Sequence, residues 1–143
     1  MARSSFKMPD DFLLKVSKLG DKTDEIIPKV LEAGGEVVKA RVKANLQAVI
    51  GTNTKEPSRS TGELVEALGV TPAGVDRNGD YNVKVGFDEP RRDGESNAKI
   101  ANIIEYGKSG QPPKPFLKPA RTASRKACIE RMKRKLDEEI GKI

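Results

Sequence analysis

The stretch "TDEIIPKVLEAGGEVVKARVKANLQAVI", residues 23–50, decides the fold class of this 143-residue chain. Its apolar side chains recur at helical spacing, and charged or amide side chains fall between them. Pro28 lies in the first turn, where a helix tolerates proline. Thr23 or Asp24 suits the position that precedes a helix, and Gly51 suits the position that ends one. The stretch therefore predicts one long amphipathic helix.

Two adjacent glycines, Gly34 and Gly35, interrupt this helical pattern. Each glycine weakens a helix by about 1 kcal/mol relative to alanine. Their place in the middle of a strongly periodic segment therefore predicts either a bend or a close neighbour.

A β-hairpin is predicted for residues 70–87, "VTPAGVDRNGDYNVKVGF". Two runs of β-prone residues flank Asn78 and Gly79, a pair that tolerates the positive φ of a tight turn. Val83, Val85 and Phe87 then share one face of the second strand.

The acidic residues of this turn resemble part of a calcium-binding loop. Asp76, Asn78 and Asp80 have the right types, but Gly79 is out of place and no glutamate follows at the required position. Turn chemistry explains them better.

An exposed loop is expected for residues 51–62, which follow the first long helix and carry no aliphatic or aromatic side chain.

A second long helix is predicted from Phe116 almost to Ile143. Its apolar stripe is clear in the second half, whereas cations occupy the same sector in the first half. Three alanines, Ala120, Ala123 and Ala127, form a separate small-residue face there. Two faces indicate either two packing partners or one helix that leaves its own core.

The order of elements predicts an α+β fold. It consists of a long N-terminal helix, a small antiparallel sheet with a β-hairpin, a short helix that ends near Tyr106, and a long C-terminal helix. We divide the chain into a basic N-terminal lead-in, residues 1–22, and a single domain, residues 23–143.

Composition argues against several classes of function. The chain has no histidine, which removes the commonest general base and the commonest transition-metal ligand. Cys128 is its one cysteine, so neither an intrachain disulfide nor a cysteine cluster for zinc is expected. No apolar run approaches the roughly 20 residues of a membrane span, and the N-terminus lacks the apolar core of a secretory signal. We expect no enzyme, no cofactor, no metal and no membrane contact.

The sequence Gly107-Lys108-Ser109 matches the end of a nucleotide-binding P-loop. The full motif has another glycine five residues before Gly107, where this chain has Asn102. The residues before it are helical in pattern rather than a strand, and prolines follow soon after. We therefore interpret Gly107 as the end of a short helix, and nucleotide hydrolysis as the least favoured function.

The positive charge is concentrated at the C-terminal end. Residues 114–143 hold ten of the 27 basic residues but only four of the 21 acidic ones, so the net charge of +6 resides in this segment. Such a segment favours an acidic partner, either nucleic acid or protein, although a solvated helix is the simpler interpretation. The predicted basic face consists of Lys118, Arg121, Arg125, Lys126, Arg131, Lys133 and Arg134.

Three short motifs occur in order along the chain. Residues 57–64 read PSRSTGEL, residues 103–107 read IIEYG, and residues 115–120 read PFLKPA. This ordered set resembles a family of tailed-phage head–tail joining and tail-completion proteins, the relatives of the gene-ten product of the Hong Kong lambdoid phage. The resemblance spans residues 24–140. It departs from the family pattern at two places: the spacing from Pro57 to Thr61 is one residue longer, and Lys108 stands where threonine is frequent.

The resemblance implies a structural virion protein of the phage neck that joins the DNA-filled head to the tail. It implies a homo-oligomeric ring, with six subunits as the expected number, and contacts with head-side connector and tail-tube or tail-terminator proteins. Its expected location is the virion, with the bacterial host cytoplasm during assembly. The alternative is a small basic nucleic-acid-binding protein that uses the C-terminal helix.

The proline-stiffened segment before the last helix is the predicted contact site. Prolines reduce the entropy lost when the segment is ordered against a neighbour, and an aromatic side chain on a stiff segment is a good anchor. The same aromatic, Phe116, fits equally well as a core residue that fixes the helix start. Glu105 is interpreted as a helix-end carboxylate that pairs with a nearby Lys or Arg. The predicted contact residues are Glu105, Tyr106, Pro115, Phe116 and Leu117.

In a ring around a DNA channel, the basic segment has two candidate partners, the passing genomic DNA and an acidic neighbouring ring. Of the two, the protein contact is slightly favoured, because strong phosphate binding would slow DNA transit.

Overall fold

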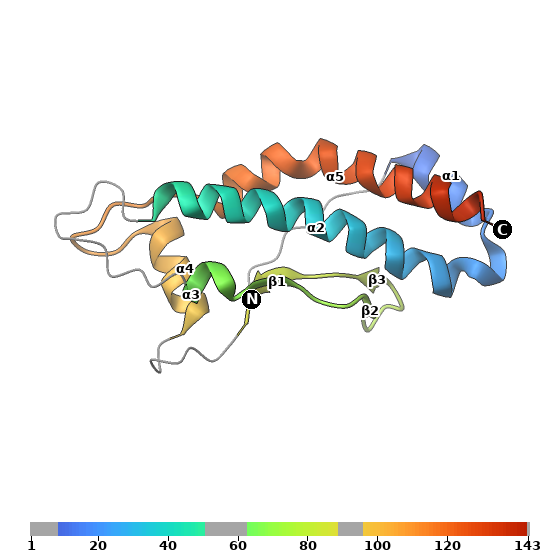
Figure 1. Cartoon of the computed structure of the whole chain (residues 1–143). Helices are drawn as coiled ribbons and strands as arrows, with labels where there is room; N and C mark the ends of the chain where they lie inside the picture. Colours follow the sequence, from blue (N-terminus) through green and yellow to red (C-terminus); the bar gives the residue numbers. More distant parts are fainter. Residues whose placement is uncertain (1–8, 51–62, 89–95, 143) are drawn as a thin grey trace.

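A long helix lies between a second long helix and a narrow β-ribbon (Figure 1). The computed structural model of the chain describes residues 9–50, 63–88 and 96–142. The central helix is α2, Thr23–Val49, and α5, Leu117–Ile140, runs antiparallel along one side of it. Both long helices are therefore confirmed, and α2 ends one residue before Ile50, close to the predicted Gly51.

The shorter elements complete the predicted α+β fold. Strands β1 and β4 pair antiparallel, with Leu68 opposite Phe87. Strands β2 and β3 continue the same ribbon toward its tip, with Gly74 opposite Asn82. The hairpin prediction is thus confirmed. The remaining bounds are α1 Asp10–Ser17, the 3-10 helix η1 Gly20–Lys22, α3 Glu63–Glu66, β1 Leu68–Val70, β2 Gly74–Val75, β3 Tyr81–Asn82, β4 Val85–Phe87 and α4 Asn97–Tyr106.

The glycine pair of α2 has close neighbours on two different sides. A Cβ added to Gly34 would lie 2.6 Å from Cγ of Met132 in α5. A Cβ added to Gly35 would lie 2.8 Å from Cγ1 of Val70 in the ribbon. Adjacent helical residues point about 100° apart, so the two glycines let both layers approach α2 at one level. Of the two predicted explanations, the close neighbour is the one that the structure supports.

The buried stripe of α5 is continuous, which corrects the prediction of two separate faces. It steps by four residues through Ala120, Ser124, Cys128, Met132 and Leu136. A step of four residues advances about 40° beyond a full turn of the helix. The stripe therefore winds slowly around α5, and the cations in the first half of the helix lie beside it rather than on it. Ala123 and Ala127 are exposed. One partner, α2, thus covers the stripe along the helix.

The N-terminal lead-in contacts the domain through its described residues. Lys15 Nζ lies 2.9 Å from Asp137 Oδ1, and Asp11 Oδ2 lies 3.0 Å from Lys133 Nζ, so α1 is tied to α5. Leu19 is buried in the core. The boundary after residue 22 stays a prediction. The predicted loop 51–62 lies outside the described residues.

Within the described ranges, no helix is both long enough and apolar enough to cross a membrane.

Replacing Gly35 with alanine is expected to destabilise the protein. In an isolated helix the change would stabilise by about 1 kcal/mol, but Val70 is β-branched and stiff, and overpacking of this kind typically loses about 1–3 kcal/mol. Urea unfolding of Gly35→Ala measures the sign directly. The double variant Gly35→Ala/Val70→Ala should lose less than the two single changes together. A Gly35→Ala protein as stable as wild type would contradict the close approach.

Candidate assembly site at the junction of α4 and α5

A buried carboxylate joins the end of α4 to the start of α5. Glu105 is 4% exposed. Its Oε2 accepts hydrogen bonds from the backbone N–H groups of Phe116 at 2.7 Å and Leu117 at 2.8 Å, and its Oε1 accepts from the N–H of Lys118 at 3.0 Å. One side chain therefore satisfies three of the N–H groups that the first turn of a helix leaves without helical partners.

The start of α5 has no local substitute for this carboxylate. Phe116 occupies the N-cap position and makes no side-chain cap, and the first turn holds no acidic residue. A negative charge at a helix N-terminus is stabilised by the exposed N–H dipoles, and hydrogen bonds to ionised acceptors are the strong ones. The interpretation of Glu105 as a partner of Lys or Arg is wrong, because its partners here are backbone amides. The sequence does carry one indication of this role: α5 has no capping residue and no acid in its first turn, so a cap from elsewhere is needed.

The link between the two helices is held by its own backbone. Gly107 has φ 77°, and an added Cβ would lie 2.8 Å from the carbonyl oxygen of Gln111. Lys108 and Gln111 exchange N–H to carbonyl hydrogen bonds at 3.0 and 2.9 Å. The N–H of Lys114 donates to the carbonyl oxygen of Ile104 at 2.7 Å. The Gly107-Lys108-Ser109 sequence thus lies in a tight turn and opens no helix.

Phe116 belongs to the core of its own chain. Its side chain is fully buried, and its ring meets that of Phe87 edge-on, with centroids 6.3 Å apart. The Asn45 side-chain amide of α2 donates to its carbonyl oxygen at 3.3 Å. Asn97, also buried, donates from its side chain to the carbonyl oxygen of Asp88 at 2.6 Å. Sequence reasoning missed both asparagines, because a polar residue on an amphipathic helix carries no sign of such a distant partner.

The five predicted contact residues separate into two groups. Glu105 and Phe116 are buried, and Leu117 is half-buried. Tyr106 and Pro115 are exposed, and 76% of Tyr106 is accessible to solvent. A partner contact through these residues stays a prediction, and its accessible side chains are those of Tyr106 and Pro115. We call the segment 105–117 the α4–α5 corner.

The predicted basic face also separates along α5. Arg131 and Lys133 are half-buried and lie near acids, since Arg131 approaches Glu138 at 4.0 Å and Lys133 approaches Asp11 at 3.0 Å. The other five side chains of the face are exposed, and four of them lie in the N-terminal half of the helix. These exposed cations are Lys118, Arg121, Arg125, Lys126 and Arg134.

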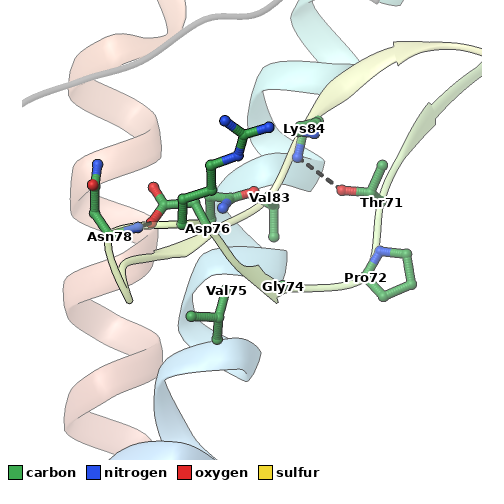
Figure 2. Close-up of a pocket in the computed structure, with 10 residues that line it drawn as sticks. Thr71, Pro72, Gly74, Val75, Asp76, Asn78, Val83 and Lys84 are labelled. Atoms are coloured by element: carbon green, nitrogen blue, oxygen red, sulfur yellow. Dashed lines mark hydrogen bonds between the residues drawn. The ribbon is translucent and has the colours of Figure 1, made fainter.

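A shallow groove lies on the hairpin (Figure 2). Asp76, in its turn, accepts from the N–H groups of Asn78 at 2.8 Å and Asp80 at 3.0 Å through Oδ1. These hydrogen bonds confirm the predicted turn chemistry. At the other end of the groove the N–H of Lys84 donates to Thr71 Oγ1 at 2.9 Å.

Packing and ion pairing shift the pKa values of two groups, Cys128 and Glu139. Burial raises the pKa of the Cys128 thiol to about 11, so the reactive thiolate is scarce at neutral pH. Hydrogen bonds from Lys135 and Lys142 hold the pKa of Glu139 below its ordinary value, although burial opposes them. Among the described residues no group of three or more Cys, Asp or Glu side chains is placed to hold a metal ion.

The α4–α5 corner contains parts of two of the three sequence motifs, those at residues 103–107 and 115–120. The sequence model of the family described as "Bacteriophage HK97-gp10, putative tail-component" matches residues 10–107, well over half of the chain. This chain belongs to the HK97-gp10-like family. Membership assigns it a structural role related to the phage tail. No curated protein and no solved structure matches the chain.

The HK97-gp10-like match differs in extent from the resemblance noted in the sequence. It begins at residue 10 rather than 24, and so includes α1. It ends at Gly107, directly after α4, and leaves out residues 115–120. The Glu105 hydrogen bonds connect the matched part to the first residues of α5, which lie beyond it.

Replacing Glu105 with alanine is expected to lower the free energy of unfolding by about 2–4 kcal/mol. The buried N–H of Phe116 and the partly buried N–H groups of Leu117 and Lys118 would lose a charged acceptor. Hydrogen exchange should accelerate most at the amides of Phe116, Leu117 and Lys118. The control is Glu130→Ala, which removes an exposed carboxylate of α5. Unchanged exchange at the three amides would show that the carboxylate does not hold the start of α5.

Proposed function

We propose that this chain is a structural protein of the phage neck that assembles into a ring at the joint between head and tail. Family membership supports the structural role and the association with phage tails. The chemistry of the described residues agrees, because the α4–α5 corner uses its one buried carboxylate to hold a helix start and pairs it with no base. Neck rings sit between other layers, so we expect a head-side connector and a tail-tube or tail-terminator protein as neighbours.

A ring of identical subunits needs two different surfaces that fit each other. Tyr106 supplies the first, since its ring projects from a corner that the Glu105 hydrogen bonds make rigid. Exposed aromatic side chains on rigid segments are frequent anchors of protein interfaces. Leu13 and Leu14 supply the second, because they are 50% and 66% exposed on α1.

These two surfaces lie at opposite ends of the molecule, with α4 at one end of the long helices and α1 at the other (Figure 1). A contact between unlike ends is heterologous, and heterologous contacts generate closed rings when the rotation between neighbours permits. Tyr106 of one copy then packs against Leu13 and Leu14 of the next. Six subunits is the number that we expect.

The experiment uses variants that each lose one surface. Tyr106→Ala and the double variant Leu13→Ser/Leu14→Ser should each fail to form rings in native mass spectrometry, while their far-ultraviolet circular dichroism stays like that of wild type. Mixing the two variants should give dimers and no larger species, because each copy keeps one intact surface.

Phe116→Ala is expected to lower the free energy of unfolding by about 3–5 kcal/mol instead, as a core change does.

Val75→Ser is the matched control, because Val75 is 60% exposed on the hairpin, outside both surfaces. It should assemble as wild type does, both alone and within purified particles. Rings formed equally well by Tyr106→Ala would contradict the proposed contact. A wild-type chain absent from purified particles would contradict the neck assignment itself.

A further inference from the structure

One end of the two-helix pair carries cations and no acids. We define the basic end as residues 37–49 of α2 and 117–129 of α5, which lie side by side because Asn45 bonds to Phe116 and Gly34 packs on Met132. The sequence of these ranges contains no Asp or Glu. Their cations are Lys39, Arg41, Lys43, Lys118, Arg121, Arg125 and Lys126.

At the other end of the same two helices, Arg134 is the one cation without an ion pair among the described residues. Lys29 approaches both Glu25 and Glu139, and Lys135 approaches Glu139 at 3.2 Å. At the basic end five cations are exposed and have no ion-pair partner among the described residues: Arg41, Lys43, Lys118, Arg125 and Lys126. The two ends of the helix pair therefore differ both in net charge and in the share of their cations that form ion pairs.

Helix stability does not account for these cations. Lys118 lies in the first turn of α5, where the helix dipole disfavours positive charge. Within α2, Lys39 and Lys43 also form an i,i+4 pair of like charge, which is destabilising. Glu105 offsets the charge of the helix start from beneath the surface. It leaves the like charges of the basic end with no acid among them, and this indicates a polyanionic ligand.

We propose that the basic end binds the phosphate backbone of duplex DNA, a property that does not rest on the ring arrangement. Protein interfaces are depleted in lysine and enriched in aromatic side chains, whereas this surface has three lysines among its five free cations and no aromatic residue. The exposed residues between the cations are small, among them Ala40, Ala44 and Ala123, so a phosphate backbone can approach closely.

The composition favours a duplex over a single strand and predicts binding without sequence preference. Single strands are held by stacking on aromatic side chains, and residues 37–49 and 117–129 contain none. Lys118 and Lys126 are separated by eight residues, which is about 12 Å along a helix axis. This length matches several base pairs of a duplex, so that a few phosphates are contacted at once. Contacts of this number are strongly weakened by salt and allow the duplex to slide.

The test measures binding of a fluorescent 30-base-pair duplex to the full chain by anisotropy, over a series of sodium chloride concentrations. Three to five phosphate contacts predict that a plot of log K, the association constant, against log salt has a slope of about −3 to −4.5. The double variant Arg125→Glu/Lys126→Glu should reduce the slope by about 2 and weaken binding at low salt by about tenfold or more.

The matched control is Lys18→Glu/Arg134→Glu. Both of its residues are exposed, lie outside the basic end and have no ion-pair partner among the described residues. The two double variants change the net charge equally, so a general attraction between a basic protein and DNA predicts equal losses. The proposal predicts less than about a threefold change for the control, with the slope retained.

Several results would overturn the proposal. These are equal losses in the two double variants, a slope near zero, no binding to the duplex at low salt, and tighter binding to a single strand of the same length. Binding of poly-glutamate that depends on Arg125 and Lys126, without binding of the duplex, would indicate an acidic protein partner instead. Ring assembly is measured separately, so failure here leaves the proposed contact between Tyr106 and α1 intact.

Discussion

The carboxylate of Glu105 determines where α5 begins, and the rest of the molecule depends on that position. Its three hydrogen bonds fix the first turn of α5 against the last turn of α4. The start of α5 sets its register along α2, so that Met132 meets Gly34 and the buried stripe faces the central helix. A shift of one residue would rotate the stripe by about 100° and replace Ser124 with Arg125 or Ala123. A side chain outside α5 therefore helps to hold the register in which the apolar stripe of α5 is buried.

The sequence predicted those elements whose information is local. The long helices follow from periodicity, and the hairpin follows from Asn78 and Gly79 between two β-prone runs. The structure confirms both, with α2 at Thr23–Val49 and the turn held by Asp76. The close approach at Gly34 and Gly35 is one of two explanations that the sequence predicts. A glycine pair indicates that a side chain is not tolerated there, but it does not identify the neighbouring residue.

The candidate site was harder to predict, because its contacts join residues that are distant in the sequence. The motif residues were recognised, yet Glu105 was assigned to a salt bridge because the amides that it bonds lie in another helix. The stripe of α5 was divided into two faces because a step of four residues drifts around the helix, and a fixed angular sector misses the drift. Asn45 and Asn97 gave no signal, since only the fold brings a carbonyl group to each of them.

The Glu105 carboxylate also makes the acid-free beginning of α5 possible. A helix N-terminus carries about half a positive charge from its aligned peptide dipoles, and Lys118 adds a full charge in the same turn. Helices usually offset this with Asp or Glu in the first turn, but an acid there would lie on the surface and neutralise the neighbouring cations. Here the compensating charge is supplied from α4 and is buried beneath the surface. The helix start is thereby stabilised from inside the fold, and the outward face of α5 keeps its cations available to a ligand.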